Sequence, residues 1–470
     1  MELSDARVAA VLGLRESGVA AALLLRRRLG IPVGAIDDKE AGELQGLDRL
    51  RTAGVELLLA DQAALPAGTS LLIKSPGVPA HNHVVQAALA AGVPVWSEVE
   101  LAGRFLTNFI VGITGTNGKT TTTELVGAVV RDAGLPVVVA GNMGHALAHV
   151  PDEAGADTVV VAELSSFQLE HIERFRVDVA VLLNVTEDHL DRHGTLADYA
   201  AAKLRIFENQ DAGCVALVNG EDAGAAPLTI PGQGRRGYFS VGAGRGPRAA
   251  GVDDGALWLD LDVLGVGGGR VRLCRADELA LRGLHNLSNS LAAAAAAAAA
   301  GVPVDSIART LRSFPGVVHR LQVVGTVDGV TYVNDSKATN VDATLKALTA
   351  YSGPVHLILG GSLKGVSFDG LAASTEGLVK EAILIGAAAP SLAEAYARRA
   401  AAPGARPTPV VQRPDLEAAL AHARDTAEPG DVVLLSPACA SFDHYRNFEH
   451  RGEHFIELVR RMQSEESPPR

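Results

Sequence analysis

The segment GITGTNGKTTT, residues 112–122, constrains the fold of this chain more than any other stretch. The apolar run FIVGIT leads into it and predicts a strand, and the residues after its lysine predict a helix. Glycines in such a turn let backbone N–H groups close around phosphate, and a lysine with a hydroxyl can hold outer phosphates and a metal. A nucleoside triphosphate site is therefore predicted, in an α/β fold with parallel strands.

This turn departs from the strict P-loop pattern, because the position of the usual first glycine is occupied by Ile113. Its end, Gly118-Lys119-Thr120, keeps the residues that matter chemically. We expect Lys119 to neutralise the β- and γ-phosphate oxygens and the Thr120 hydroxyl to bind Mg²⁺. The predicted nucleotide-binding residues of the turn are Gly115, Thr116, Asn117, Gly118, Lys119, Thr120 and Thr121.

Composition narrows the class of protein. With 470 residues and 47% hydrophobic content, the chain can build two to four domains with sizeable cores. Its net charge of −12 argues against non-specific binding to nucleic acid or to an anionic membrane surface. The three cysteines form no CxxC pair, and neither a signal peptide nor a membrane-spanning stretch is recognisable, so we expect a cytoplasmic protein without membrane insertion.

Short apolar runs alternate with helical stretches along three blocks, which predicts α/β architecture with mainly parallel sheets. The expected domains are 1–107, a Rossmann-like domain; 108–316, a central ATPase-like parallel sheet; and 317–470, a second Rossmann-like domain. Within the central block, residues 232–269 are glycine-rich and contain short strand candidates such as ALWLDLDV. That stretch predicts a β excursion or a flexible insert.

Two further strands of the central block end in polar residues. The run VVVAE ends at Glu163, and VDVAVLLNVTEDH leads to Asp188 and His189. Because sites in open α/β sheets form at the carboxyl ends of strands, we expect these side chains to join Lys119 and Thr120 at one edge. Oxygen ligands with one imidazole favour Mg²⁺ or Mn²⁺ over zinc. Taken singly, Glu163 is better explained as a solvated helix cap and His189 as a surface histidine, and it is their shared position after the strands that favours the site.

Lys203 stands in the helical run YAAAKLRIFENQ, among small and apolar neighbours. A lysine whose stem packs on the helix while its ammonium reaches solvent is one interpretation. The other is a desolvated, neutral and nucleophilic amine.

In the third block, four segments follow apolar runs or adjoin them: HR at 319–320, NDSKATN at 334–340, GGSLKG at 360–365 and SPACASFD at 436–443. Such loops predict a pocket for a substrate that carries carboxylates.

Taken together, these segments resemble one family along essentially the whole chain. The chain resembles the ATP-dependent Mur ligases of peptidoglycan synthesis, and among them the D-glutamate-adding members, through TGTNGKT, ELSSFQLE, NVTEDHLDRH, YAAAKLRIFE, GLHNLSN, HR, NDSKATN and SPACASFD, in this order. ELSSFQLE and SPACASFD are specific to those members. In the loop that binds the UDP moiety, here residues 13–18, Arg15 stands where relatives usually have a glycine.

The resemblance implies a ligase with three substrates: ATP, UDP-N-acetylmuramoyl-L-alanine and D-glutamate. It implies Lys119, His189, Lys203 and Asp335 as catalytic residues. It also implies two metal ions, Mg²⁺ or Mn²⁺, held by Thr120, Glu163, His189 and Lys203, the last as a carbamate formed with CO₂. The amine of D-glutamate needs a base, for which His189 and Asp335 both remain open.

The implied binding residues fall into three groups. For ATP they add Asn286, Asn289, Arg320 and Asp335 to the turn. For the UDP substrate they are Ser17, Gly18, Asp37, Asp38, Lys39, Gly77, Asn142, Ser165 and Gln168. For D-glutamate they are Lys337, Thr339, Lys364, Ser441, Phe442 and Phe448. We expect a monomer whose third domain is mobile.

The implied reaction has two steps, transfer of the γ-phosphate to the carboxylate of the UDP substrate and attack of the amine on the acyl phosphate. One alternative is another amide ligase of this superfamily, such as a folylpolyglutamate synthase or a different Mur ligase. Another is a P-loop switch that only binds or hydrolyses ATP, which leaves the third-block loops without a purpose.

Overall fold

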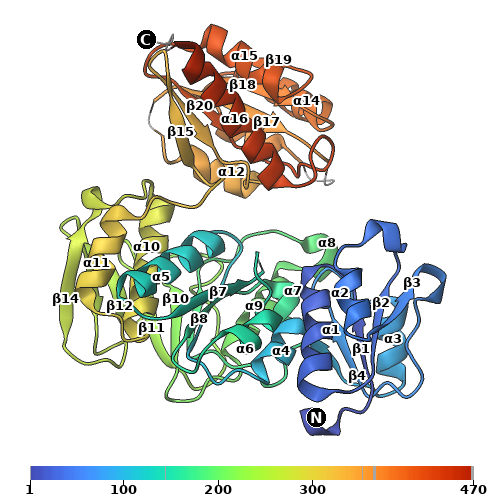
Figure 1. The fold of residues 1–470 in the computed structure, drawn as a ribbon. Coiled ribbons are helices and arrows are strands. Elements are labelled where there is room, and N and C mark those ends of the chain that lie inside the picture. The colour runs from blue at the N-terminus through green and yellow to red at the C-terminus, as the bar shows by residue number, and fades with distance from the viewer. Residues whose placement is uncertain (1, 143, 352, 364–366, 467–470) are drawn as a thin grey trace. The chain divides into compact units, whose positions relative to one another are not determined.

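The computed structural model describes residues 2–142, 144–351, 353–363 and 367–466. The described residues fold into three sheets with helices between the strands, and most strand pairs are parallel (Figure 1). Two compact units divide the chain: Met1–Ala280 with Leu287–Phe314, and Leu281–Asn286 with Pro315–Arg470. The first unit contains two of the sheets and the second unit the other. The predicted α/β class is confirmed, whereas the division at residues 107 and 316 stays a prediction.

The first sheet has the order β3-β2-β1-β4-β5, and all of its pairs are parallel. Its strands are β1 (Ala9–Leu12), β2 (Val33–Asp37), β3 (Glu56–Leu59), β4 (Leu71–Lys74) and β5 (Val95–Ser97). Its helices are α1 (Glu16–Leu29), α2 (Leu47–Thr52), α3 (His83–Ala90) and α4 (Glu98–Gly103). Alternate strand residues face opposite sides, as a strand requires. Ala9 and Val11 pack with α1, and Ala10 and Leu12 pack with α3.

The second sheet has the order β14-β13-β12-β11-β10-β9-β6-β8-β7. Its parallel strands are β6 (Ile110–Thr114), β7 (Val137–Gly141), β8 (Val159–Glu163), β9 (Val179–Leu182), β10 (Val215–Asn219), β11 (Arg235–Ser240) and β12 (Arg248–Asp253). The antiparallel strands β13 (Ala256–Asp260) and β14 (Arg270–Arg275) extend it. The glycine-rich stretch is therefore a β excursion of this sheet.

The helices of this part of the chain are α5 (Lys119–Asp132), α6 (Val150–Glu153), α7 (Ser166–Leu169), α8 (Leu190–His193), α9 (Leu196–Leu204), α10 (Leu284–Ala299) and α11 (Val304–Ser313). The alanine run of α10 is buried. Among the described residues, none of the helices combines the length and the apolar character needed to cross a membrane.

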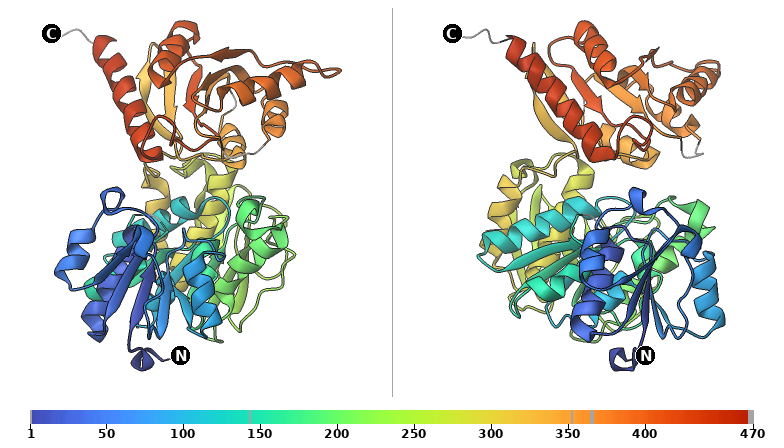
Figure 2. Two further views of the ribbon diagram at one scale, coloured as in Figure 1. Left: turned by 90° about the vertical axis from the view of Figure 1, so that its right-hand side faces the viewer. Right: turned by 45° about the vertical axis from the view of Figure 1, so that its right-hand side comes forward.

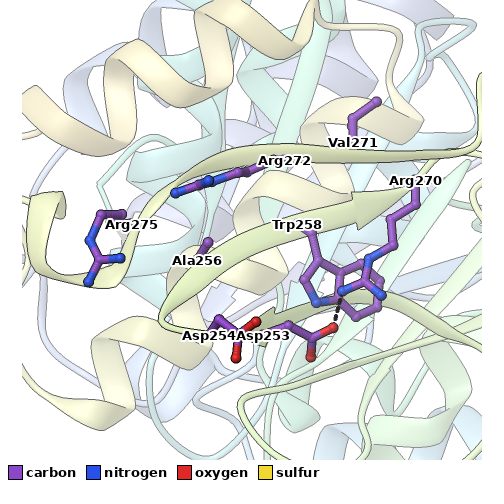
Figure 3. Close-up of a pocket in the computed structure, with 8 residues that line it drawn as sticks. All are labelled: Asp253, Asp254, Ala256, Trp258, Arg270, Val271, Arg272 and Arg275. Carbon is purple, nitrogen blue, oxygen red and sulfur yellow. Dashed lines mark hydrogen bonds and ion pairs between the residues drawn. The ribbon is translucent and has the colours of Figure 1, made fainter.

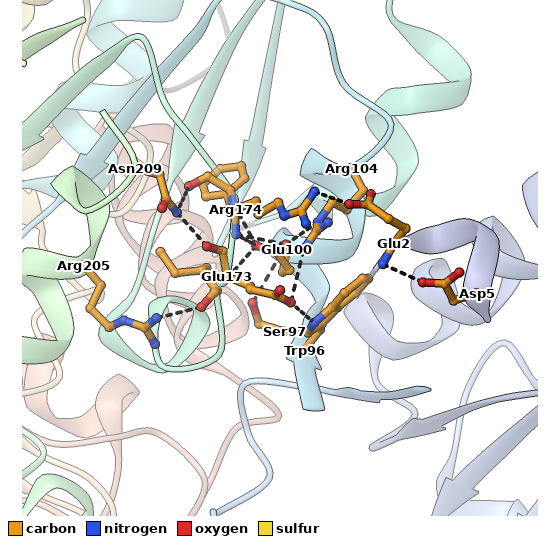
Figure 4. Close-up of polar contacts among 12 residues, drawn as sticks. Glu2, Asp5, Trp96, Ser97, Glu100, Arg104, Glu173, Arg174, Arg205 and Asn209 are labelled. Atoms are coloured by element: carbon orange, nitrogen blue, oxygen red, sulfur yellow. Dashed lines mark hydrogen bonds and ion pairs between the residues drawn. The ribbon is translucent and has the colours of Figure 1, made fainter. Parts of the chain in front are cut away.

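The first two sheets are joined by a buried carboxylate on α4 (Figure 4). Glu100 accepts hydrogen bonds from the backbone N–H groups of Glu173, Arg174 and Phe175, and it pairs with Arg104. The indole of Trp96 donates to the Glu173 carboxylate at 2.8 Å. Because a buried charge with several donors is stabilised, this network holds the segment before β9 onto α4 and β5.

The third sheet has the order β15-β16-β20-β17-β18-β19, and only the β15–β16 pair is antiparallel. Its strands are β15 (Gln322–Val327), β16 (Val330–Asn334), β17 (Val355–Gly360), β18 (Val379–Ile385), β19 (Val410–Gln412) and β20 (Val432–Leu435). Helices α13 (Asp369–Ser374) and α14 (Ala389–Ala400) pack on one face, and α15 (Leu416–Thr426) and α16 (Phe448–Glu466) pack on the other (Figure 2). Helix α12 (Val341–Leu348) follows the loop after β16.

Candidate functional site

The turn between β6 and α5 has the geometry of a phosphate loop. Gly118 caps α5 at φ +84°, a conformation that favours glycine, and an added Cβ would lie 2.5 Å from Asn289 Oδ1. The ammonium of Lys119 folds back over the turn and donates to the carbonyls of Gly115 and Thr116, each at 2.9 Å. The backbone N–H groups at the start of α5, with this cation beside them, suit an anionic ligand.

Asn184, which sequence reasoning missed, braces this turn from the segment after β9. Its Oδ1 accepts from the Asn117 N–H at 2.8 Å, and its Nδ2 donates to the Asn117 carbonyl at 3.0 Å. Thr116 is tied to the same segment, since its N–H donates to the Asn184 carbonyl and its Oγ1 accepts from the Thr186 N–H. Asn184 directly follows an apolar strand, a position that could have identified it.

Strand β6 lies between β8 and β9, so the three carboxyl ends are adjacent. Ile113 pairs with Glu163, and Thr114 pairs with Leu182. Glu163 is buried and accepts a hydrogen bond from Asn142 Nδ2 at 3.0 Å. The sequence prediction that these strands converge at one sheet edge agrees with this register.

Lys203 on α9 reaches the same turn. Lys203 is 1% exposed, and its Nζ donates to the Gly115 carbonyl at 2.8 Å and lies 4.3 Å from the centre of the Tyr199 ring. Burial, reinforced by the charge of Lys119, lowers the pKa of Lys203 well below its ordinary value. Its surroundings therefore agree with the desolvated amine rather than with a lysine that reaches solvent.

His189 begins α8 at φ +55°, in the left-handed region that a non-glycine residue seldom adopts. Its Nε2 lies 3.7 Å from Asp188 Oδ2, and its ring centre lies 4.9 Å from that of Phe167. Over the described residues, no group of three or more His, Cys, Asp and Glu side chains could by itself hold a metal ion. The Thr120 hydroxyl and the Glu163 and Asp188 carboxylates are nevertheless hard oxygen donors of the kind that Mg²⁺ prefers.

The residues predicted to contact the UDP substrate form two groups within the first unit, one beside the first sheet and one beside the second sheet. Ser17 and Gly18 open α1, and the Ser17 hydroxyl lies 3.5 Å from that of Ser75. A Cβ on Gly18 would lie 1.8 Å from the Gly13 carbonyl oxygen. Asp37 ends β2 and is followed by Asp38 and Lys39, and Gly77 follows β4. Asp37 accepts from the Leu14 N–H at 2.7 Å, so part of its capacity is used to shape the first turn.

The second group lies beside the second sheet and consists of Asn142, Ser165 and Gln168. Asn142 follows β7, and its N–H donates to the Glu163 carbonyl at 2.8 Å. Ser165 caps α7, and its hydroxyl and N–H bond reciprocally with Gln168. The ELSSFQLE segment thus includes a capping box, which fixes the start of α7 directly after Glu163.

In the second compact unit, Asp335 follows β16 and is buried beside Ser436, which follows β20. The Ser436 hydroxyl donates to Asp335 at 2.8 Å, and the Leu321 N–H donates at 3.2 Å. Burial raises the pKa of Asp335 to about 6, although the charge of Arg320 acts in the opposite direction. Asn286 Nδ2 donates to the Arg282 carbonyl at 2.8 Å in the same unit, whereas Asn289 contacts the phosphate turn of the first unit.

Two of the residues predicted to bind D-glutamate lie together, since Phe448 opens α16 and Lys337 lies against its ring. The Lys337 ammonium lies 5.4 Å from the centre of the Phe448 ring, Ser441 is buried and Phe442 is 71% exposed. Thr339 lies on the loop after β16, and Lys364 lies outside the described residues. Arg451, which sequence reasoning missed, organises these loops by donating to the carbonyls of Ser336 and Cys439 at 2.9 and 3.1 Å.

A separate pocket of about 550 Å³ lies on the β13–β14 hairpin (Figure 3), lined by Asp253, Asp254, Ala256, Trp258, Arg270, Val271, Arg272 and Arg275. Arg270 stacks on Trp258 at 3.6 Å from the ring centre and pairs with Asp253. None of the predicted site residues lines this pocket.

Comparisons with known proteins agree with the geometry. The model of the Mur ligase middle domain matches residues 113–297, and that of the Mur ligase glutamate ligase domain matches residues 319–439. A UDP-N-acetylmuramoylalanine–D-glutamate ligase of Pelotomaculum thermopropionicum is 44% identical over 96% of both chains, and one of Solibacter usitatus is 43% identical over 98% of both. The crystal structure of a UDP-N-acetylmuramate–alanine ligase from Thermotoga maritima has a TM-score of 0.57 at 20% identity, covering 98% of this chain and all of that one.

Proposed function

The chain belongs to the Mur ligase family, and on that premise we propose that it adds D-glutamate to UDP-N-acetylmuramoyl-L-alanine. It is an ATP-dependent, amide-bond-forming ligase of peptidoglycan precursor synthesis. The observation that carries the proposal is the 44% identity, over nearly the full length of both chains, to a relative named for this reaction. The convergence of Lys119 and Lys203 on one glycine-rich turn supports an ATP site there.

In the proposed first step, an oxygen of the substrate's alanine carboxylate attacks the γ-phosphorus of ATP. A new O–P bond forms, the bond to the bridging oxygen of the β-phosphate breaks, and ADP leaves with that electron pair. Two anions must approach each other, so the ammonium of Lys119 and the N–H groups at the start of α5 would stabilise the developing charge.

A divalent cation bound here would supply further positive charge to the transferring phosphoryl group. Thr120 and Glu163 are proposed to hold a first Mg²⁺, and His189 with a carbamate on Lys203 a second, with Mn²⁺ as a substitute. The carbamate requires a neutral amine, which adds to CO₂ with loss of one proton. The low pKa of the buried Lys203 supports that neutral state.

In the proposed second step, the amine of D-glutamate attacks the acyl carbonyl, and phosphate leaves as the amide forms. The amine must lose a proton, for which His189 and Asp335 are the two candidate bases. The raised pKa of Asp335, about 6, supports a carboxylate able to accept a proton near neutral pH. Arg320 and Asp335 are also proposed to contact ATP, as are Asn286 and Asn289.

D-glutamate is proposed to bind through Lys337, Thr339, Lys364, Ser441, Phe442 and Phe448. The UDP substrate is proposed to bind through Ser17, Gly18, Asp37, Asp38, Lys39, Gly77, Asn142, Ser165 and Gln168.

The functional domains proposed are 1–107 for the UDP substrate, 108–316 for ATP, and 317–470 for the amino acid. We further propose a cytoplasmic monomer whose product supports cell shape and division.

Release of ADP in the presence of UDP-N-acetylmuramoyl-L-alanine and a panel of amino acids tests the proposal. We expect release that requires both the UDP substrate and D-glutamate, with L-glutamate, L-lysine and diaminopimelate inactive. Release that needs neither would favour a hydrolase or switch, and a preference for another amino acid or for a folate acceptor would favour another amide ligase.

A further inference from the structure

A cluster of charged side chains lies where the loop after β4 meets the loops of the second sheet. It consists of Lys74, Glu170 and Arg192, which we call the junction cluster. Glu170 Oε2 lies 2.8 Å from Arg192 Nη2 and 3.6 Å from Lys74 Nζ. Lys74 is fully buried, and the other two side chains are no more than 19% exposed. Since buried charges are expensive, their position calls for a physical explanation.

The two cations of the junction cluster bind the main chain of one short loop. Arg192 donates to the carbonyls of Pro76 and Val78 at 2.6 and 3.2 Å, and Lys74 donates to the Val78 carbonyl at 2.9 Å. Because these bonds go to backbone oxygens, they fix the path of residues 75–78 whatever side chains the loop carries. That loop includes Gly77, and its Ser75 hydroxyl donates to the Gly13 carbonyl at 2.6 Å. The cluster therefore orients the turn that opens α1 as well.

The other ends of the junction cluster lie in the segments that carry predicted metal and substrate residues. The Arg192 N–H donates to the His189 carbonyl at 3.1 Å, so Arg192 is fixed to the first turn of α8. Its guanidinium also lies 3.9 Å from the ring centre of Phe167, next to Gln168. Glu170 is the last residue of the segment ELSSFQLE, which begins at Glu163. One side chain thus connects the loop after β4 with the ends of β8 and β9.

A role in stability alone, as a link between the first two sheets, explains the junction cluster less well than a role in positioning the substrate-side loops. The Glu100 network already joins them, through four backbone and side-chain partners at a separate point of the junction (Figure 4). The junction cluster differs because all of its contacts converge on the substrate-side loops. Phe167, which Arg192 covers, also contacts His189 at a ring-centre distance of 4.9 Å.

We propose that Arg192, held by Glu170 and Lys74, is a positioning residue that sets the UDP substrate's carboxylate in register with the phosphate turn. It touches neither reacting atom; it acts through the loop at 75–78 on one side and the His189 segment on the other. The inference rests on the proposed function, because it assigns the UDP substrate to the loop after β4.

The test compares Arg192→Met with Arg192→Lys and with a matched control, Arg26→Met, in the full-length protein. Arg26 also donates to backbone carbonyls, those of Ala53, Gly30 and Ile31, but it lies on α1 away from the junction cluster. For each variant, KM for UDP-N-acetylmuramoyl-L-alanine, ATP and D-glutamate is measured with kcat, and thermal unfolding is recorded.

For Arg192→Met we expect KM for the UDP substrate to rise about tenfold or more, with KM for ATP and D-glutamate within about twofold of the parent. Arg192→Lys should recover part of the loss, since an ammonium can bind one carbonyl but not the whole set. Arg26→Met should leave all three KM values unchanged. The inference is overturned if Arg192→Met raises the three KM values equally or not at all, or if Arg26→Met reproduces its pattern. Absence of D-glutamate-dependent ADP release in the parent protein would instead overturn the proposed function.

Discussion

Two turns of the first compact unit share a backbone plan and differ in charge. Residues 13–18 connect β1 to α1, and residues 115–119 connect β6 to α5. Each follows a strand with parallel partners on both sides, contains a glycine at positive φ (Gly13 at +88°, Gly118 at +84°) and opens a helix of 14 residues. In the second turn, the side-chain nitrogens of Lys119 and Lys203 both donate to the Gly115 carbonyl, and Lys119 carries the positive charge. In the first, the Gly13 carbonyl receives the neutral Ser75 hydroxyl.

The comparison separates what topology provides from what side chains add. A helix N-terminus at the carboxyl edge of a parallel sheet offers N–H groups and a partial positive charge in both turns. This suffices to bind a diphosphate that does not react. Transfer of a phosphoryl group needs positive charge placed against the transition state, which the second turn carries in Lys119. We therefore expect the first turn to govern binding and the second to govern turnover.

The largest expected effect is that of removing Lys119. Lys119→Met should lower kcat/KM by about 10³ or more, because a preorganised cation is lost from the transferring phosphoryl group. Steady-state ADP release, with circular dichroism to confirm folding, measures it. Retention of a tenth of the activity by a folded variant would contradict the division of labour between the turns.

Removing Lys203 should have the next largest effect on activity. The same change should lower activity but raise the stability of the fold. Lys203→Met should lower kcat by about 10² or more, since a carbamate can no longer form. Lys203→Arg should fail equally, because its charge is permanent.

The pKa of Lys203 is lowered in the folded state, so below its ordinary pKa the unfolded chain binds the proton more readily and the lysine destabilises the fold. Lys203→Met should therefore raise the unfolding temperature by a few degrees. Unchanged activity of the parent in CO₂-depleted buffer, or of Lys203→Met in any buffer, would contradict the carbamate.

Alanine at the two helix-opening glycines compares the turns directly. Gly18→Ala places a Cβ 1.8 Å from the Gly13 carbonyl oxygen, and Gly118→Ala places one 2.5 Å from Asn289 Oδ1 at a positive φ. We expect a rise of about tenfold in KM for the UDP substrate in the first variant and for ATP in the second, each with loss of stability of about 2 kcal/mol. Titration calorimetry with UDP and with a non-hydrolysable ATP analogue should reproduce the split. The same substrate affected in both variants would mean that the turns do not act separately.

The smallest expected effects are at the residues that brace each turn. Asn184→Ala removes two bonds to Asn117, and Ser75→Ala removes the bond to the Gly13 carbonyl. At about 0.5 kcal/mol for each of the two bonds to Asn117 and about 1 kcal/mol for the single bond to Gly13, each variant loses about 1 kcal/mol, so KM for ATP in the first variant and KM for the UDP substrate in the second should each rise roughly fivefold. Substrate titrations of both variants, with kcat near that of the parent, measure this. A lowered kcat with normal KM values would assign Asn184 to the chemistry instead.

Local patterns predicted the parts of the fold and site that depend on neighbouring residues. The strand-to-helix change around Gly115 and the apolar runs before Glu163 and Asp188 are both recognisable in short windows of the sequence. The rule that parallel strands deliver their ends to one edge then brought Glu163 beside the phosphate turn.

The residues whose contacts the sequence did not predict act through partners far away in the sequence. Asn184 braces Asn117 across 67 positions, Arg451 holds Ser336 across 115, and Arg192 reaches Pro76 across 116. Nothing within ten residues of these side chains indicates their partners, and each binds backbone atoms, which carry no sequence signal. Lys203 was ambiguous for a related reason: its burial depends on packing against the turn at Gly115, which periodicity alone does not determine.

The claim that the terminal phosphate activates a carboxylate is tested most directly by isotope transfer. UDP-N-acetylmuramoyl-L-alanine labelled with ¹⁸O in both carboxylate oxygens is converted with ATP and D-glutamate, and the released phosphate is analysed by mass spectrometry. The account predicts one ¹⁸O in each phosphate, because the attacking carboxylate oxygen stays on phosphorus when the amine expels it. If the amide forms and the released phosphate contains no ¹⁸O, the account is contradicted.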